Sequence, residues 1–184
     1  MSVTSAAPLA ELLARLPEAA KDLRVNLQNL LSGGEGPLTP EQRWGTAIAS
    51  AIASRSPELA RALAAEAPGE RKDAVVDDAR AAAALMGMTN IYYRFRHLVG
   101  KPGYAAKPPR LRMQRLAKPA TSAADLELFS LAVSAITGCE QCVRAHEEQV
   151  GKAGLTEDQV HDAVRIAAVV HGVAAGLIAG VSSP

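Results

Sequence analysis

The sequence predicts an all-α protein that contains one helical unit twice. Alanine and leucine dominate its 184 residues, prolines fall at the breaks between helical stretches, and alternating runs of β-branched residues are missing. Capping motifs mark several helix starts, and two stretches about 85 residues apart resemble each other. A chain of this length can bury a continuous core, so we expect a single domain over residues 1–184.

Capping residues, proline and glycine set the expected helix boundaries. The stretch TPEQ at 39–42 combines an N-cap hydroxyl, a proline at the first helical position and a glutamine three residues after the cap, which predicts a helix towards residue 54. SPE at 56–58 opens the next helix, and the capping box TEDQ at 156–159 opens the last. The other helices are expected at about 8–31, 71–98 and 122–137, with a connecting loop at 100–109.

Two pairs of segments indicate an internal duplication. KDAVVDDARAAAALMG at 72–87 aligns without gaps with EDQVHDAVRIAAVVHG at 157–172, and SAIAS at 50–54 matches SAITG at 134–138. We therefore expect two similar halves, about 1–99 and 110–184. Chance similarity between two alanine-rich helices is the alternative.

Only the second half carries a pair of cysteines. Opposite Cys139, Cys142 and His146 the first half has surface-type or small residues, namely Arg55, Glu58 and Ala62. Positions that served packing alone would be apolar in both halves, so we expect the functional site in the second half.

Composition and charge exclude several classes of partner. A net charge of +1 gives no electrostatic reason to expect nucleic acid or acidic lipid. The N-terminal stretch lacks a basic region followed by an apolar block, which favours a cytoplasmic protein. The apolar run at 166–181 is shorter than the roughly 20 residues of a membrane span and is expected to be a buried terminal helix.

The segment ITGCEQCVRAHEE at 136–148 holds both cysteines of the chain. In a reducing cytosol a single CxxC is typical of a redox or metal site rather than of a structural disulfide. Gly138 is expected to end one helix and Cys139 to lie at the start of the next, where free N–H groups and the helix dipole stabilise a thiolate. The spacing of three residues places both sulfurs on one helical turn, which suits a reversible disulfide.

His146 follows Cys142 by four residues, so its imidazole can reach the Cys142 sulfur and act as its base. Cys142 is then the activated cysteine, and Cys139, nearer the helix start, is expected to be the more exposed partner. On the preceding helix, Glu127 is the acid that best fits an inward-facing position to orient the base, although a surface or capping role is the alternative from spacing alone.

The spacing of Glu127, Cys139, Cys142 and His146, together with WGT at 44–46 and MGMTNIYYR at 86–94, closely resembles the alkyl hydroperoxide reductase D (AhpD) family of the carboxymuconolactone decarboxylase-like superfamily. The resemblance covers almost the whole chain. It implies the all-helical, internally duplicated AhpD-like fold and a homotrimer.

The resemblance also implies an activity, namely that of a lipoyl-dependent antioxidant enzyme. Dihydrolipoamide, carried on a dehydrogenase-complex acyltransferase and recharged by dihydrolipoamide dehydrogenase, would reduce the dithiol, and no tightly bound cofactor is implied. The electrons would pass to the peroxiredoxin AhpC, which reduces alkyl hydroperoxides, and direct peroxidase activity would be weak. By the same resemblance Glu127 acts through His146 to deprotonate Cys142, and Cys139 completes the disulfide.

One position departs from the pattern of the best-known members, which carry a histidine directly before the second cysteine, where this chain has Gln141. Glutamine cannot exchange a proton. The neighbouring Glu140 adds a negative charge that is expected to oppose thiolate formation. The redox cycle is expected to survive, with an altered rate and pH optimum.

The remaining candidates favour plainer interpretations. His171, flanked by apolar residues, is expected to be a core histidine, and His97 and His161 to be surface or interface residues. The aromatic cluster Tyr92, Tyr93 and Phe95 favours core or subunit-interface packing.

Two rival functions follow from the same residues. The first is a structural zinc site formed by Cys139, Cys142 and His146, which lacks an obvious fourth ligand and a second ligand pair. The second is lactone decarboxylation, an activity of superfamily relatives that lack the dithiol.

Overall fold

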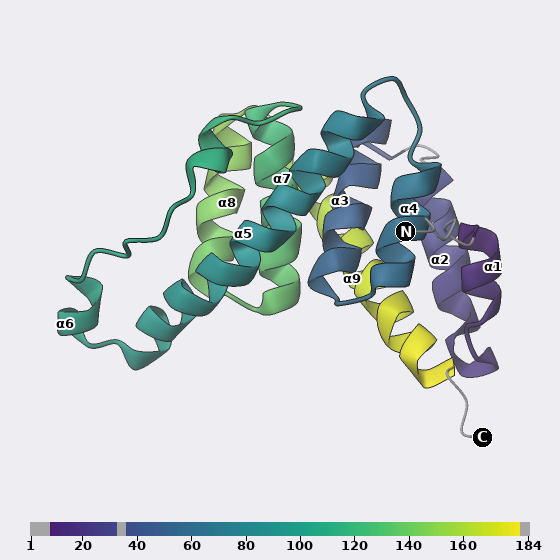
Figure 1. Cartoon of the computed structure of the whole chain (residues 1–184), viewed down its shortest axis with the longest axis horizontal. Coiled ribbons are helices and arrows are strands. Elements are labelled where there is room, and N and C mark those ends of the chain that lie inside the picture. The colour runs from purple at the N-terminus through teal and green to yellow at the C-terminus, as the bar shows by residue number, and fades with distance from the viewer. Residues whose placement is uncertain (1–7, 33–35, 181–184) are drawn as a thin grey trace, which may run out of the picture.

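The computed structural model describes residues 8–32 and 36–180, and within these ranges it contains helices and no strand. This confirms the predicted all-α fold class. Figure 1 shows the long helix α5 crossing one side of the pair formed by α3 and α7, while α9 lies against the other side. The α-helices are α1 (Leu9–Ala14), α2 (Lys21–Ser32), α3 (Pro40–Ala53), α4 (Pro57–Glu66), α5 (Lys72–Val99), α6 (Pro102–Ala105), α7 (Ala123–Thr137), α8 (Glu140–Lys152) and α9 (Glu157–Gly180).

Most helix boundaries match the expectation, because local capping decides them. The Thr39 hydroxyl accepts from the backbone N–H of Gln42, and the Gln42 side chain accepts from the backbone N–H of Thr39. Thr156 and Gln159 form the same reciprocal pair before α9. The single helix expected at 8–31 is wrong: the chain breaks at Pro17, and a short 3-10 helix at Glu18–Ala20 connects α1 to α2.

Two triplets of helices follow one another with similar spacing. Helices α3, α4 and α5 begin at residues 40, 57 and 72, and α7, α8 and α9 begin at 123, 140 and 157. Corresponding starts are thus 83, 83 and 85 residues apart. This spacing supports our proposal that the chain contains two copies of one unit, with the break between them in the segment after α5.

Helix α9 is buried along one face. Within the described part of the chain it is the one helix long and apolar enough to cross a membrane. Its residues Ala163, Ile166, Val170 and Val173, at helical spacing, are buried in the core, as expected for the terminal helix of a globular domain. The prediction of a core histidine is wrong: the side chain of His171 is exposed at the edge of this face, where its Nδ1 is 3.0 Å from the hydroxyl of Ser54.

The helices α3 and α7 approach each other closely at Gly45. A Cβ atom at this position would lie 2.1 Å from the ring of Phe129, which is fully buried. The ring of Phe129 therefore packs against the backbone of α3, and only a glycine at position 45 leaves room for it. This contact gives a physical reason for the glycine in the WGT stretch.

Asp78 holds the end of the segment that leads into α7. Its fully buried carboxylate accepts hydrogen bonds from the backbone N–H groups of Ala120 and Thr121, from the Thr121 hydroxyl and from the Arg115 guanidinium. Burial raises the pKa of Asp78, but the bonds from Thr121, Ala120 and Arg115 outweigh it and hold this pKa below its ordinary value of 3.8.

We predict that Gly45→Ala lowers the free energy of unfolding by about 1 to 3 kcal/mol, because the added methyl group overlaps the Phe129 ring. Gly87→Ala is the matched control: it lies in α5 with open space around it, and it should leave stability unchanged or raise it by up to about 1 kcal/mol. Urea denaturation followed by circular dichroism measures both. Equal effects of the two substitutions would contradict the close packing.

We also predict that Asp78→Asn lowers stability at neutral pH by about 2 kcal/mol, because charge-assisted hydrogen bonds are lost in a buried place. The folded-state pKa is lowered, so the carboxylate stabilises the fold above its ordinary pKa, and this contribution disappears as the pH falls through the folded-state value. The gap between wild type and variant should therefore narrow in acid. Asp77→Asn is the control, because Asp77 contacts the same arginine from an exposed position and should cost less than about 1 kcal/mol.

Candidate active site

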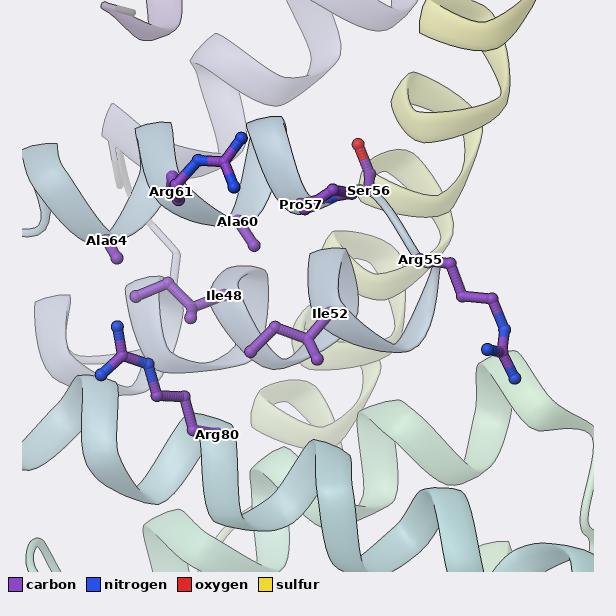
Figure 2. Close-up of a pocket in the computed structure, with 9 residues that line it drawn as sticks. All are labelled: Ile48, Ile52, Arg55, Ser56, Pro57, Ala60, Arg61, Ala64 and Arg80. Carbon is purple, nitrogen blue, oxygen red and sulfur yellow. The ribbon is translucent and has the colours of Figure 1, made fainter. Parts of the chain in front are cut away.

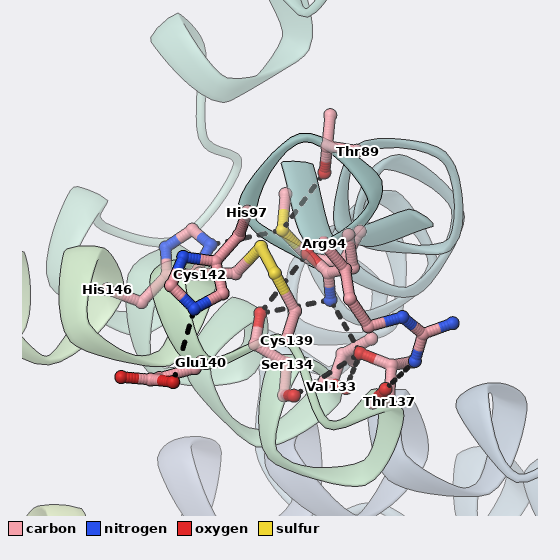
Figure 3. The surroundings of a disulfide bond; sticks show 12 residues. Thr89, Arg94, His97, Val133, Ser134, Thr137, Cys139, Glu140, Cys142 and His146 are labelled. Carbon is pink, nitrogen blue, oxygen red and sulfur yellow. Dashed lines mark hydrogen bonds and ion pairs between the residues drawn. A yellow bond between two sulfur atoms is a disulfide. The ribbon is translucent and has the colours of Figure 1, made fainter. Parts of the chain in front are cut away.

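The two cysteines lie at the turn between α7 and α8. Gly138 ends α7 in the left-handed conformation with φ of 66°, and Cys139 then occupies the N-cap position of α8. The sulfurs of Cys139 and Cys142 form a disulfide, with their Cα atoms 5.2 Å apart (Figure 3). The helix boundary expected from the sequence is confirmed, and the first turn of α8 presents its free N–H groups next to the sulfurs.

His146 and Glu127 are brought together across α7 and α8. The Nδ1 atom of His146 lies 2.6 Å from Oε2 of Glu127, in a place where both side chains are largely shielded from solvent. The carboxylate therefore fixes the orientation of the imidazole ring, as a carboxylate does in other histidine-based sites. Of the two sequence-based alternatives for Glu127, the structure shows the inward-facing position.

The second nitrogen of the ring faces a methionine. Nε2 of His146 is 3.1 Å from the sulfur of the buried Met86, a residue of α5 that lies 60 positions earlier in the chain. Both ring nitrogens of His146 are thus oriented by neighbouring side chains in this disulfide form.

A cavity of about 250 Å³ opens over the disulfide. Cys142 and His146 line it, and so do apolar or weakly polar side chains from α5, from α8 and from the segment before α7. The expectation that Cys139 is the more exposed cysteine is wrong: Cys139 is fully buried, and Cys142 lines the cavity. The other lining residues are Met86, Thr89, Asn90, Tyr93, Met113, Leu116, Gln141 and Ala145.

Helix α5 also fastens the turn that carries the cysteines. The amide of Asn90 donates to the hydroxyls of Ser134 at 3.1 Å and of Thr137 at 2.8 Å. Arg94 donates to the carbonyl of Thr137 (Figure 3). Sequence reasoning missed these roles. The stretch MGMTNIYYR contains Met86, Asn90 and Arg94 at intervals of four residues, and that spacing on one helix face was the available signal.

The charge of Glu140 is compensated. Its carboxylate lies 3.0 Å from Arg144 on the next turn of α8 and 3.4 Å from Nε2 of the exposed His97. The expected opposition of Glu140 to a thiolate is therefore weakened by its neighbours. Gln141 lines the cavity, so the position that departs from the best-known members faces the site.

The first half of the chain has a cavity of about 290 Å³ at the start of α4, but with different chemistry. Figure 2 shows the apolar side chains of Ile48 and Ile52 on α3, with Arg55, Arg61 and Arg80 around them. Neither cysteine nor histidine lines this cavity. The redox chemistry is thus confined to the cavity over α8 in the part of the chain that is described.

The residues of the zinc alternative do not form a metal-binding cluster. Both sulfurs belong to the disulfide, and His146 is held between Glu127 and Met86. Among residues 8–32 and 36–180 no group of three or more His, Cys, Asp or Glu side chains is arranged to hold a metal ion.

Known proteins resemble this chain over most of its length. The model of the carboxymuconolactone decarboxylase family matches residues 102–179. The chain is 61% identical over 173 residues to alkyl hydroperoxide reductase AhpD of Anaeromyxobacter sp. (strain Fw109-5), which covers 94% of this chain and 92% of that protein. The chain belongs to the AhpD family. A protein of the same name from Methylobacterium sp. (strain 4-46) is 49% identical over 166 residues, or 90% of this chain and 93% of that protein.

Membership of the AhpD family confirms the resemblance drawn from the CxxC segment and its flanking stretches. The relatives carry the name alkyl hydroperoxide reductase, which supports the role of a peroxidase-type oxidoreductase. A disulfide at the CxxC of this chain agrees with that role.

We predict that Met86→Leu slows reduction of the disulfide by dithiothreitol about fivefold, because the ring of His146 loses the acceptor that orients Nε2. Met88→Leu is the control: it makes the same change two residues along α5, at a partly exposed position outside the cavity. Stopped-flow kinetics measures both rates. Equal rates in the two variants would show that the sulfur contact does not matter.

Proposed function

We propose that this protein is a thiol-disulfide oxidoreductase that takes electrons from dihydrolipoamide and passes them to the peroxiredoxin AhpC, which reduces alkyl hydroperoxides. No tightly bound cofactor is needed. The observation that carries the proposal is the Glu127–His146 pair, 2.6 Å apart, beside a disulfide that lines an apolar cavity.

The reductive half-reaction begins with attack on the accessible sulfur. A thiolate of dihydrolipoamide attacks Cys142, the disulfide breaks, and Cys139 leaves as a thiolate at the start of α8, where helix N–H groups stabilise it. The second thiol of the donor then gives its proton to His146 and attacks the donor sulfur of the mixed disulfide. Cys142 leaves and takes this proton from His146, so two electrons have moved and lipoamide is released.

The oxidative half-reaction runs through the same groups in reverse. His146, oriented by Glu127, accepts the proton of Cys142, and the resulting thiolate attacks the disulfide of the peroxiredoxin. Cys139 then resolves the mixed disulfide. In the weak direct reaction, the Cys142 thiolate attacks a hydroperoxide oxygen, an alcohol leaves, and condensation of the sulfenic acid with Cys139 releases water.

The proposal includes the assembly and the partners expected for the family. We propose a homotrimer, a lipoylated acyltransferase and dihydrolipoamide dehydrogenase as the electron supply, and a cytoplasmic location. Support for self-association comes from a row of exposed apolar side chains at helical spacing along α5, namely Met88, Ile91, Phe95 and Leu98.

We predict that NADH is consumed when this protein is combined with dihydrolipoamide dehydrogenase, lipoamide, AhpC and an organic hydroperoxide. Cys142→Ser should abolish turnover, and Glu127→Gln should lower it about tenfold to a hundredfold, because the ring of His146 loses its orienting carboxylate. Glu148→Gln, at an exposed position on the same helix, is the control and should retain full turnover. Absence of turnover in the wild type, with every coupling component active, would refute the proposed function.

A further inference from the structure

The charges of the chain are strongly segregated, although they almost cancel. Residues 79–124 contain nine Lys or Arg and no Asp or Glu, while the rest of the chain has eleven Lys or Arg and all nineteen acids. The first stretch is therefore strongly basic and the remainder is acidic. Such an asymmetry favours an oriented approach of a charged partner.

Most of the unpaired charge of this stretch lies on a projecting segment, residues 101–118, which we call the basic arm. Figure 1 shows the chain after α5 carrying α6 away from the helical body before it returns towards α7. Arg115 pairs with Asp77 and Asp78. The other cations of the arm are exposed and have no carboxylate partner in the described chain, namely Lys101, Lys107, Arg110, Arg112 and Lys118.

The arm is fixed at both ends. Near its start the ring of Tyr104 stacks edge-on against Phe95, with ring centroids 5.3 Å apart, and Arg96 donates to the carbonyl of Ala105. At its end the buried carboxylate of Asp78 holds Arg115. The cations are thus displayed by an anchored segment, which reduces the entropy that a partner must remove on binding.

The arm also forms one wall of the redox cavity. Met113 and Leu116 line the cavity together with Cys142 and His146. A macromolecule bound along the arm therefore lies next to the sulfur that a reductant must attack. The cations are spread along the segment rather than gathered around one point, so they suit an extended acidic surface better than a small anion.

Resting on the function proposed above, we propose that the basic arm docks an acidic face of the lipoylated protein that reduces the disulfide. The complex aligns the cavity with the flexible lipoyl group, whose apolar chain enters between Met113, Leu116 and Tyr93. The reduced dithiolane then reaches Cys142. Charge attraction on the arm raises the rate of encounter, and the cavity itself selects the reactive group.

The test compares a protein-borne donor with a free one. The rate constant for reduction of the disulfide is measured by stopped-flow with the reduced lipoylated domain of the acyltransferase and with free dihydrolipoamide, at ionic strengths from about 0.01 to about 0.15 M. In Lys101→Glu/Lys107→Glu the rate with the lipoylated domain at low salt should fall about tenfold or more and lose its salt dependence. The rate with free dihydrolipoamide should equal that of the wild type.

Arg61→Glu/Lys152→Glu is the matched control, because it makes the same change in net charge at exposed positions outside the arm and the redox cavity. It should retain the salt-dependent rate with the lipoylated domain. Equal losses in both double variants would overturn the docking site, since net charge alone would then explain them.

Three further results would show that the proposed function is wrong or that the arm has a different partner. A wild type that free dihydrolipoamide fails to reduce would refute the proposed function rather than the docking site. A lower molar mass of the arm variant in light scattering would assign the arm to contacts between copies of this chain and overturn the proposal. Tighter binding of a single-stranded oligonucleotide than of the lipoylated domain would overturn it in favour of a nucleic-acid partner.

Discussion

The close approach of α3 and α7 at Gly45 determines where the chemistry lies. Phe129 rests directly on the backbone of α3, so the depth and rotation of α7 are fixed at that contact. Glu127 lies two residues before Phe129 on α7, and Gly138 ends the same helix and starts the turn to α8. A shift of α7 would therefore move the carboxylate and the dithiol together, while the contacts with α5 would be lost.

Contacts with helix α5 also hold the site in position. Along one face, at intervals of four residues, Met86 contacts the imidazole of His146, Asn90 binds the hydroxyls near the end of α7, and Arg94 binds the last carbonyl of that helix. The three helices α5, α7 and α8 therefore hold one histidine and one turn from different directions. Such support from separate elements keeps reacting groups in position during a cycle in which the disulfide opens and closes.

The local part of this structure was accessible from the sequence, and the long-range part was not. Helix starts at Thr39 and Thr156, the turn at Gly138 and the spacing from Cys142 to His146 depend on residues within one or two helical turns. The contact of His146 with Met86 joins residues 60 apart, so no local pattern encodes it.

The wrong predictions for His171 and Cys139 each have a geometric cause. His171 has apolar neighbours in sequence and follows the buried Ala167 by four residues, but it lies at the edge of the buried face of α9 and its side chain is exposed. Cys139 comes first in its helix, which suggests exposure. The backbone N–H of Cys139 instead donates to the carbonyl of Ser134, so the turn folds against α7 and buries the sulfur.

This burial gives the two sulfurs different chemical surroundings. In the proposed cycle, a nucleophile in the cavity attacks Cys142 and Cys139 is the leaving group. Cys139 lies at an N-cap position where no side chain caps the free N–H groups of α8. Cys142 in turn lies beside a histidine that both a carboxylate and a thioether hold in orientation. In the proposed cycle, helix N–H groups stabilise the Cys139 thiolate and His146 exchanges a proton with Cys142, so a dithiol can open this disulfide and an oxidant can close it again.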